Sequence, residues 1–127
     1  MKRLLIVDDA LFMRRLIAGV AMEAGWEVAG EAADGARAVA MHAELRPDLT
    51  TMDLVMPVMG GLEALARIRE ADPDARVVVI TAVDQKQSVL DAIRLGAVDF
   101  IVKPFDRDRV VSLLRKAAER EEPPTDG

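Results

Sequence analysis

Short apolar runs alternate with amphipathic stretches along almost the whole chain. Runs rich in valine, isoleucine and leucine predict short strands, and continuous apolar runs predict strands that are covered on both faces. Stretches with apolar residues at helical spacing predict helices, and several of them are followed by glycine or proline. The predicted strands cover residues 4–7, 27–32, 49–52, 76–80 and 98–102. The predicted helices cover 11–24, the stretch between Asp34 and Pro47, 62–70, 85–95, and a last segment that starts near Asp106.

This fivefold alternation of strand and helix predicts an α/β fold. Parallel strands joined by right-handed crossovers form one sheet, and the helices pack on both of its faces. A chain of 127 residues has the length of a single domain. We expect that domain to cover residues 1–120, followed by a flexible tail over 121–127 that is acidic and contains proline.

Polar groups follow four of the five predicted strands. Asp8 and Asp9 follow the first strand, Asp53 the third, Thr81 the fourth and Lys103 the fifth. The carboxyl ends of parallel strands lie at one edge of the sheet, where open α/β sheets bind their ligands. We therefore expect three carboxylates, a hydroxyl and an ammonium to share one cleft.

Three neighbouring carboxylates need positive charge, because they repel one another in a partly dry cleft. The set offers only oxygen ligands, the chain has no cysteine, and its one histidine, His42, is expected on the solvent side of a distant helix. Mg²⁺ is therefore favoured over zinc or copper. A carboxylate beside Mg²⁺ and an ammonium is suited to accept a phosphoryl group, with Thr81 and Lys103 in contact with it.

Composition narrows the classes of partner. Lysine and arginine number 17 against 22 acidic residues, for a net charge of −5, and there are three phenylalanines and one tryptophan. These values argue against nucleic acid as a partner. No apolar run approaches the roughly 20 residues of a membrane span. Without cysteine or a targeting segment, we expect a cytoplasmic protein.

Each of these features, taken alone, also has a purely structural explanation. Asp8–Asp9 would more often be a helix cap or a turn acid, and Asp53 a turn residue. Thr81 is ordinary at a strand end, and Lys103–Pro104 is an ordinary loop. Their placement at one edge of a single sheet favours the functional interpretation.

A series of motifs in order resembles the response-regulator receiver family over residues 3 to about 118. They are Asp8-Asp9, Asp53 followed by Met56-Pro57 and Gly60-Gly61, Thr81-Ala82, and Lys103-Pro104-Phe105. A finer likeness, to the stand-alone chemotaxis regulators of that family, is carried by three runs: Asp8-Asp9-Ala10-Leu11-Phe12-Met13-Arg14, Thr51-Met52-Asp53 and Asp99-Phe100-Ile101-Val102-Lys103-Pro104-Phe105. The resemblance implies a flavodoxin-like fold with the five strands in the order 2-1-3-4-5.

The resemblance also implies a role for each residue of the cleft. Asp53 would be the phosphoacceptor. Asp9, Asp53 and the backbone carbonyl of Val55 would bind Mg²⁺ directly, and Asp8 would bind it through water. Lys103 would contact the phosphoryl group.

A conformational switch follows from the same resemblance. Thr81 would move toward the phosphoryl group, and the ring of Phe100 would turn into the vacated space. The switch would remodel the surface of the fourth helix, the last strand and the fifth helix. The peptide bond between Lys103 and Pro104 would be cis.

Two departures from the family pattern modify these expectations. Phe100 lacks the hydroxyl that a tyrosine would present to a partner. Val55 and Val83, two positions after Asp53 and Thr81, are apolar where some receivers carry groups that assist the hydrolytic water. We therefore predict slow autodephosphorylation.

Two other classes of function compete with a phosphoacceptor switch. A Mg²⁺-dependent phosphatase with an aspartyl nucleophile would need an acid two residues after Asp53, where this chain has Val55. A flavodoxin-like cofactor module would need a phosphate-binding loop after the first strand, where this chain has Asp8-Asp9-Ala10-Leu11. We therefore expect a signalling switch that catalyses only its own phosphorylation and dephosphorylation.

The resemblance implies a histidine kinase as phosphodonor. The chain ends soon after the fifth predicted helix, so we expect a stand-alone regulator that binds a flagellar motor switch protein or another output protein. A phosphatase is a further candidate partner. A phosphorelay intermediate and a receiver cut from a longer protein near Pro123–Pro124 remain open alternatives. We expect a monomer, and dimerisation on phosphorylation stays open.

Overall fold

The computed structural model describes residues 1–82 and 84–119. Five strands and five helices alternate along this part of the chain. The strands are β1 (Arg3–Val7), β2 (Glu27–Ala32), β3 (Leu49–Met52), β4 (Val77–Ala82) and β5 (Asp99–Lys103). The helices are α1 (Leu11–Glu23), α2 (Gly35–Leu45), α3 (Gly61–Ala71), α4 (Lys86–Arg94) and α5 (Arg107–Glu119). The predicted elements are therefore confirmed, with boundaries that differ by a few residues.

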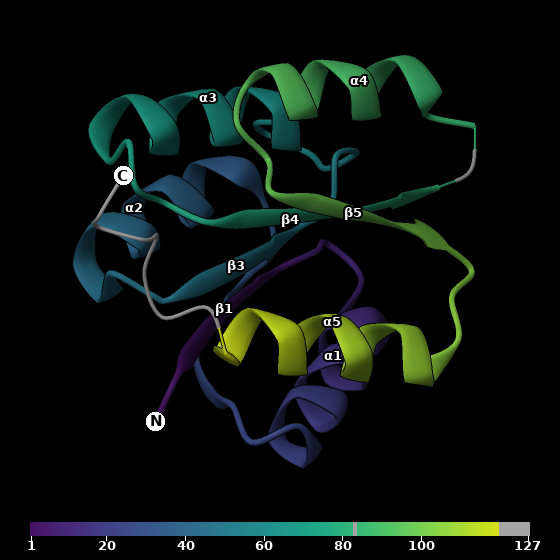
Figure 1. Ribbon diagram of the computed structural model, residues 1–127. Helices are drawn as coiled ribbons and strands as arrows, with labels where there is room; N and C mark the ends of the chain where they lie inside the picture. The colour runs from purple at the N-terminus through teal and green to yellow at the C-terminus, as the bar shows by residue number, and fades with distance from the viewer. Residues whose placement is uncertain (83, 120–127) are drawn as a thin grey trace, which may run out of the picture.

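The strands form one parallel sheet in the order β2-β1-β3-β4-β5. Helices α1 and α5 cover one face, and α2, α3 and α4 cover the other, as Figure 1 shows. This arrangement confirms the predicted doubly wound α/β fold. It follows from the continuous apolar character of the central strands, which must be shielded from water on both faces.

The hydrophobic core is divided by the sheet. Alternate side chains of β1, such as Leu4 and Ile6, pack with α1 and α5, whereas Leu5 and Val7 pack toward α2 and α3. The indole of Trp26 lies in the first cluster and donates a hydrogen bond of 2.9 Å to the carbonyl of Leu114 in α5. The two apolar clusters hold the sheet rigidly, so its carboxyl edge is a fixed platform for side chains.

His42 lies buried in α2, which corrects the expectation of a solvated side chain. Helical periodicity explains its position, because Ala38 and His42 share the buried face of α2. Burial lowers the pKa of the imidazole; nearby Asp72 raises this pKa and Arg46 lowers it further.

Within the described residues, none of the helices combines the length and apolar character that a bilayer crossing requires. The predicted tail over 121–127 and Val83 lie outside the described residues.

Candidate functional site

Strand register brings the first and third strand ends together. Val7 of β1 lies opposite Met52 of β3, and the next residue on each strand is an aspartate. The main-chain amide of Asp53 donates to the carbonyl of Val7 at 3.0 Å, which continues the ladder one residue beyond the strands. Asp8 and Asp53 are therefore neighbours at the carboxyl edge of the sheet because of backbone pairing.

Asp8, Asp9 and Asp53 form one acidic cluster. A carboxylate oxygen from each lies within 4.8 Å of the others. Asp8 and Asp53 are buried, whereas Asp9 is exposed. Three convergent oxygen donors with one side open to solvent fit a hard divalent cation that retains water, and Mg²⁺ is such a cation.

Lys103, the last residue of β5, supplies positive charge to this cluster. Its Nζ lies 2.9 Å from Oδ2 of Asp8 and 3.3 Å from Oδ2 of Asp53. Burial lowers the pKa of the ammonium, but the hydrogen bond to Asp8 and the charges of Asp53 and Asp8 outweigh this effect, so the pKa is raised. Lys103 therefore stays charged at neutral pH. The Lys103–Pro104 peptide bond is cis, the geometry that the receiver resemblance implies.

The carboxyl group of Asp53 has a raised pKa even though the Lys103 ammonium lies beside it. Burial is the largest influence and raises the pKa of its carboxyl group. Lys103 lowers this pKa, Asp8 raises it, and the net pKa lies above the ordinary value for aspartate. A cation that joined the cluster would favour the ionised carboxylate, which is the nucleophilic form.

Thr81 presents a buried hydroxyl close to the end of β4. Its Oγ1 has no hydrogen-bond partner among the described residues. A buried hydroxyl without a partner is unfavourable, and Thr50 and Thr51 share this feature. Thr81 lies next to the last residue of β4, at the edge where the carboxylates gather, so a ligand at that edge could become its partner. An arriving phosphoryl oxygen would be such a partner.

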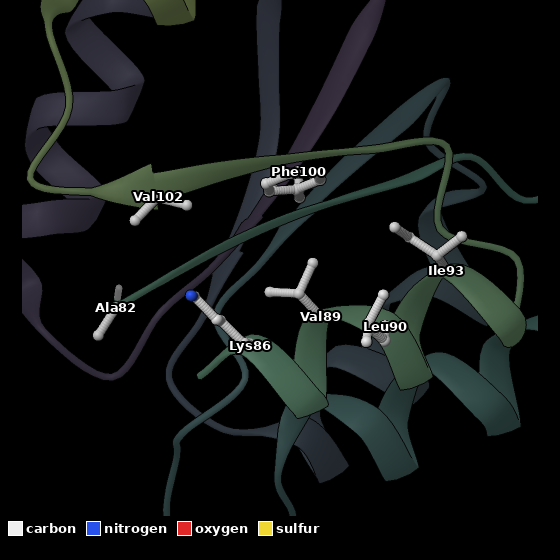
Figure 2. Close-up of a pocket in the computed structure, with 7 residues that line it drawn as sticks. All are labelled: Ala82, Lys86, Val89, Leu90, Ile93, Phe100 and Val102. Atoms are coloured by element: carbon white, nitrogen blue, oxygen red, sulfur yellow. The ribbon is translucent and has the colours of Figure 1, made fainter. Parts of the chain in front are cut away.

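Phe100 of β5 lies on the same sheet face as Thr81. Phe100 pairs with Val79 and Val102 pairs with Thr81, so the four side chains project toward α4. The ring of Phe100 is 37% exposed and lines an apolar groove between α4 and β5, shown in Figure 2. The groove is lined by Ala82, Lys86, Val89, Leu90, Ile93, Phe100 and Val102.

The loop after Asp53 is tightly turned. Val58 adopts a φ of +68°, and the amide of Met59 donates to the carbonyl of Pro57 at 2.7 Å. A Cβ on Gly61 would lie 2.2 Å from the carbonyl oxygen of Asp53. Gly61 thus lets the first turn of α3 pack directly against the backbone of Asp53.

The helix-cap interpretation of the aspartate pair does not account for its position. The N-cap of α1 is Ala10, and no side chain caps this helix end. Asp8 accepts the Ala10 amide at 2.9 Å, while its other carboxylate oxygen accepts from Lys103. Asp8 and Asp9 therefore belong to the acidic cluster and do not cap α1.

One residue of this region is absent from the sequence-based prediction. Arg14 of α1 donates from Nη1 to the main-chain carbonyl of Asp8 at 2.8 Å. In the sequence it stands in the first turn of the helix after β1, within a run that resembles the family, and nothing there assigns it a role. From the sequence alone, an arginine at that position would be interpreted as an ordinary solvent-exposed helix residue.

Comparison with known proteins gives consistent results. Residues 4–115 match the family described as "Response regulator receiver domain". The chain is 50% identical over 117 residues to "Chemotaxis protein CheY" of Thermotoga maritima, covering 92% of this chain and 98% of that protein. It is 51% identical over 118 residues to "Chemotaxis protein CheY" of Listeria monocytogenes, covering 93% of this chain and 99% of that protein.

A solved structure shares both the fold and part of the sequence. The "CheX-CheY-BeF3-Mg+2 complex from Borrelia burgdorferi" aligns with a TM-score of 0.85 and 37% identity, covering 93% of this chain and 88% of that chain. The five-stranded topology, the strand-end cluster and the extent of these matches together show that the chain belongs to the response-regulator receiver family.

Proposed function

We propose that this chain is a two-component response regulator that accepts a phosphoryl group on Asp53 and acts in chemotaxis. The observation that carries the proposal is the convergence of three carboxylates and the Lys103 ammonium at one sheet edge. The similarity to chemotaxis proteins over most of their length supports the process. The cytoplasmic location expected from the sequence remains part of the proposal.

Phosphoryl transfer requires an in-line nucleophile and charge neutralisation. A carboxylate oxygen of Asp53 attacks phosphorus as the P–N bond of a phosphohistidine breaks. The electron pair leaves with the imidazole, which takes up a proton, and an acyl phosphate forms. Lys103, already 3.3 Å from Asp53, forms an ion pair with the transferred group.

Mg²⁺ would be held by Asp9, Asp53 and the carbonyl of Val55, with Asp8 acting through water. When bound, the ion neutralises the charge on the phosphoryl oxygens. Val55 offers no acid side chain for a hydrolase mechanism and is 60% exposed. We therefore assign Asp53 the role of acceptor in a switch.

The output of the switch is the surface formed by α4, β5 and α5. The unpartnered hydroxyl of Thr81 binds a phosphoryl oxygen, and the ring of Phe100 turns inward beside it. That movement changes the apolar groove in which Phe100 stands (Figure 2). A flagellar motor switch protein is the proposed partner for this surface. The Borrelia complex supports a CheX-like protein as a further partner.

The first test is the intact mass of the protein after incubation with acetyl phosphate and Mg²⁺. We expect a gain of one phosphoryl group in the native chain. The gain should be absent in Asp53→Asn and absent when Mg²⁺ is removed by a chelator. Consumption of the phosphate ester without an adduct would contradict the proposal and favour a hydrolase.

A further inference from the structure

Arg14 connects α1 both to β2 and to Asp8, the residue that follows β1. From α1 its Nη1 donates to the carbonyl of Asp8 at 2.8 Å, and its Nε donates to Oε1 of Glu31 in β2 at 3.1 Å. The side chain is only 16% exposed. Two contacts of a planar guanidinium in different directions leave it little freedom to rotate.

The position of Arg14 is unfavourable for the helix itself. It is the fourth residue of α1, near the positive end of the helix dipole, where a cation is destabilising. That helix end also has no acidic residue in its first turn and no side-chain cap. A residue that violates local preference yet makes two half-buried hydrogen bonds is best explained by a role outside the helix.

The carbonyl that Arg14 holds belongs to the peptide unit between Asp8 and Asp9. Because a peptide unit is planar, fixing its oxygen also fixes the direction from which the Asp9 backbone continues. The Asp8 carboxylate has partners of its own in Lys103 and the Ala10 amide. Across residues 1–82 and 84–119, no hydrogen bond to the Asp9 carboxylate is found. The orientation of this carboxylate therefore depends on the conformation of the main chain.

We infer that Arg14 is a positioning residue of the metal site. It orients the Asp8–Asp9 peptide so that the exposed Asp9 carboxylate points into the cluster, and Glu31 holds Arg14 in the required rotamer. This inference rests on the proposed function, because it presumes that the cluster binds Mg²⁺. Its effect reaches the ion through Asp9, and Arg14 itself touches neither the ion nor a phosphoryl group.

The sign of the effect separates positioning from simple electrostatics. A guanidinium near the cluster repels a divalent cation, so removal of its charge alone would tighten Mg²⁺ binding. Loss of positioning would weaken Mg²⁺ binding instead, because groups that orient metal ligands contribute about 10- to 100-fold in affinity. Arg15 provides a matched control, since it is exposed and carries the same charge on the same helix.

The experiment is calorimetric titration of MgCl₂ into the native chain, Arg14→Met, Arg14→Lys and Arg15→Met. We expect the Kd for Mg²⁺ to rise roughly tenfold in Arg14→Met, and less in Arg14→Lys, which keeps one donor. Arg15→Met should bind as the native chain does, or slightly more tightly. An Arg14→Met affinity equal to or above that of Arg15→Met would overturn the inference.

Amide hydrogen exchange without metal provides a readout that does not depend on a loaded site. We expect faster exchange at residues 8–10 in Arg14→Met and unchanged exchange in β4. If Arg14→Met does not fold, Glu31→Gln tests the same link, and we expect a smaller rise in the Kd. Native-like Mg²⁺ affinity in that variant would then contradict the inference.

The two proposals fail in distinguishable ways. If the native chain binds Mg²⁺ and gains a phosphoryl group while Arg14→Met matches Arg15→Met, only the role of Arg14 is wrong. If the native chain neither binds Mg²⁺ nor gains a phosphoryl group, the proposed function fails, and the metal-positioning role fails with it.

Discussion

The ammonium of Lys103 lies 2.9 Å from the carboxylate of Asp8, although 95 positions separate the two residues in the chain. The carboxylate of Asp53 lies 3.3 Å from the same ammonium. The side chains of Asp8 and Asp53 are only 2% and 10% exposed, so water compensates little of their charge. The lysine therefore stabilises the folded state, in addition to the phosphoryl contact proposed for it.

Replacing Lys103 with methionine should destabilise the metal-free protein. Two nearly buried carboxylates would lose their shared cation, at a cost of about 1–3 kcal/mol in the free energy of unfolding. Mg²⁺ should recover part of this loss, because the ion supplies the missing charge. Urea unfolding with a chelator and with Mg²⁺ measures both values. The control Lys86→Met, at an exposed site, should leave the free energy of unfolding unchanged in both buffers. If Lys103→Met lost as much free energy of unfolding with Mg²⁺ as with the chelator, the prediction would be contradicted.

Asp53→Asn should stabilise the metal-free fold at neutral pH. Burial raises the pKa of Asp53, so the folded state favours the protonated form and loses stability as pH rises through the folded-state pKa. Because asparagine does not ionise, Asp53→Asn removes this pH-dependent loss of stability. The gain should shrink as the pH falls toward the ordinary aspartate pKa of about 3.9. Thermal unfolding across this pH range measures the effect, with the exposed Asp74→Asn as a neutral control. A variant less stable than the native chain at pH 7 without metal would refute it.

Thr81→Val should separate stability from signalling. The Thr81 hydroxyl has no hydrogen-bond partner in the part of the chain that the structure describes, so valine should leave the free energy of unfolding unchanged or raise it by about 1 kcal/mol. The variant should still gain a phosphoryl group on Asp53, but hydrogen exchange in α4 and β5 should no longer respond to phosphorylation. Thr51→Val removes another unpartnered buried hydroxyl and should keep the response. A normal response in Thr81→Val would show that Thr81 is not part of the switch.

The chain's single histidine should make the fold sensitive to mild acid. Burial lowers the pKa of His42; Asp72 opposes this shift and Arg46 reinforces it. The neutral form is therefore favoured in the folded state. The free energy of unfolding should be highest at pH values above about 6.5, the pKa of histidine in the unfolded state. It should decline as the pH falls below that value. His42→Leu should flatten this decline, as measured by urea unfolding at about pH 7.5 and about pH 5.5. The same slope in both proteins would exclude His42 as the cause.

Slow loss of the phosphoryl group remains a prediction. Val55 is exposed beside the site and cannot orient a hydrolytic water, whereas an amide could. Val55→Asn should shorten the lifetime of the acyl phosphate several-fold, measured by the decay of the phosphorylated mass. Val58→Asn, at another exposed valine of the same loop, should not. A half-life of seconds in the native chain would contradict the prediction. The prediction of slow autodephosphorylation also rests on Val83, which lies outside the described residues.

The sequence alone determined the elements and the edge at which chemistry gathers. Continuous apolar runs such as residues 77–80 must be covered on both faces, so they specify strands of a parallel sheet. Asp8, Asp53 and Lys103 follow or end such runs, so parallel pairing places them at one edge whatever the loops do. These features depend on local periodicity, which a sequence displays directly.

Tertiary structure decided the contacts that turn this edge into a site. The position of Lys103 between Asp8 and Asp53 and the contact of Gly61 with the Asp53 backbone depend on strand register and loop conformation. The hydrogen bond from Arg14 to the Asp8 carbonyl depends on them too. Such contacts join groups far apart in the sequence or involve main-chain atoms that every residue shares, so no pattern of residue types marks them.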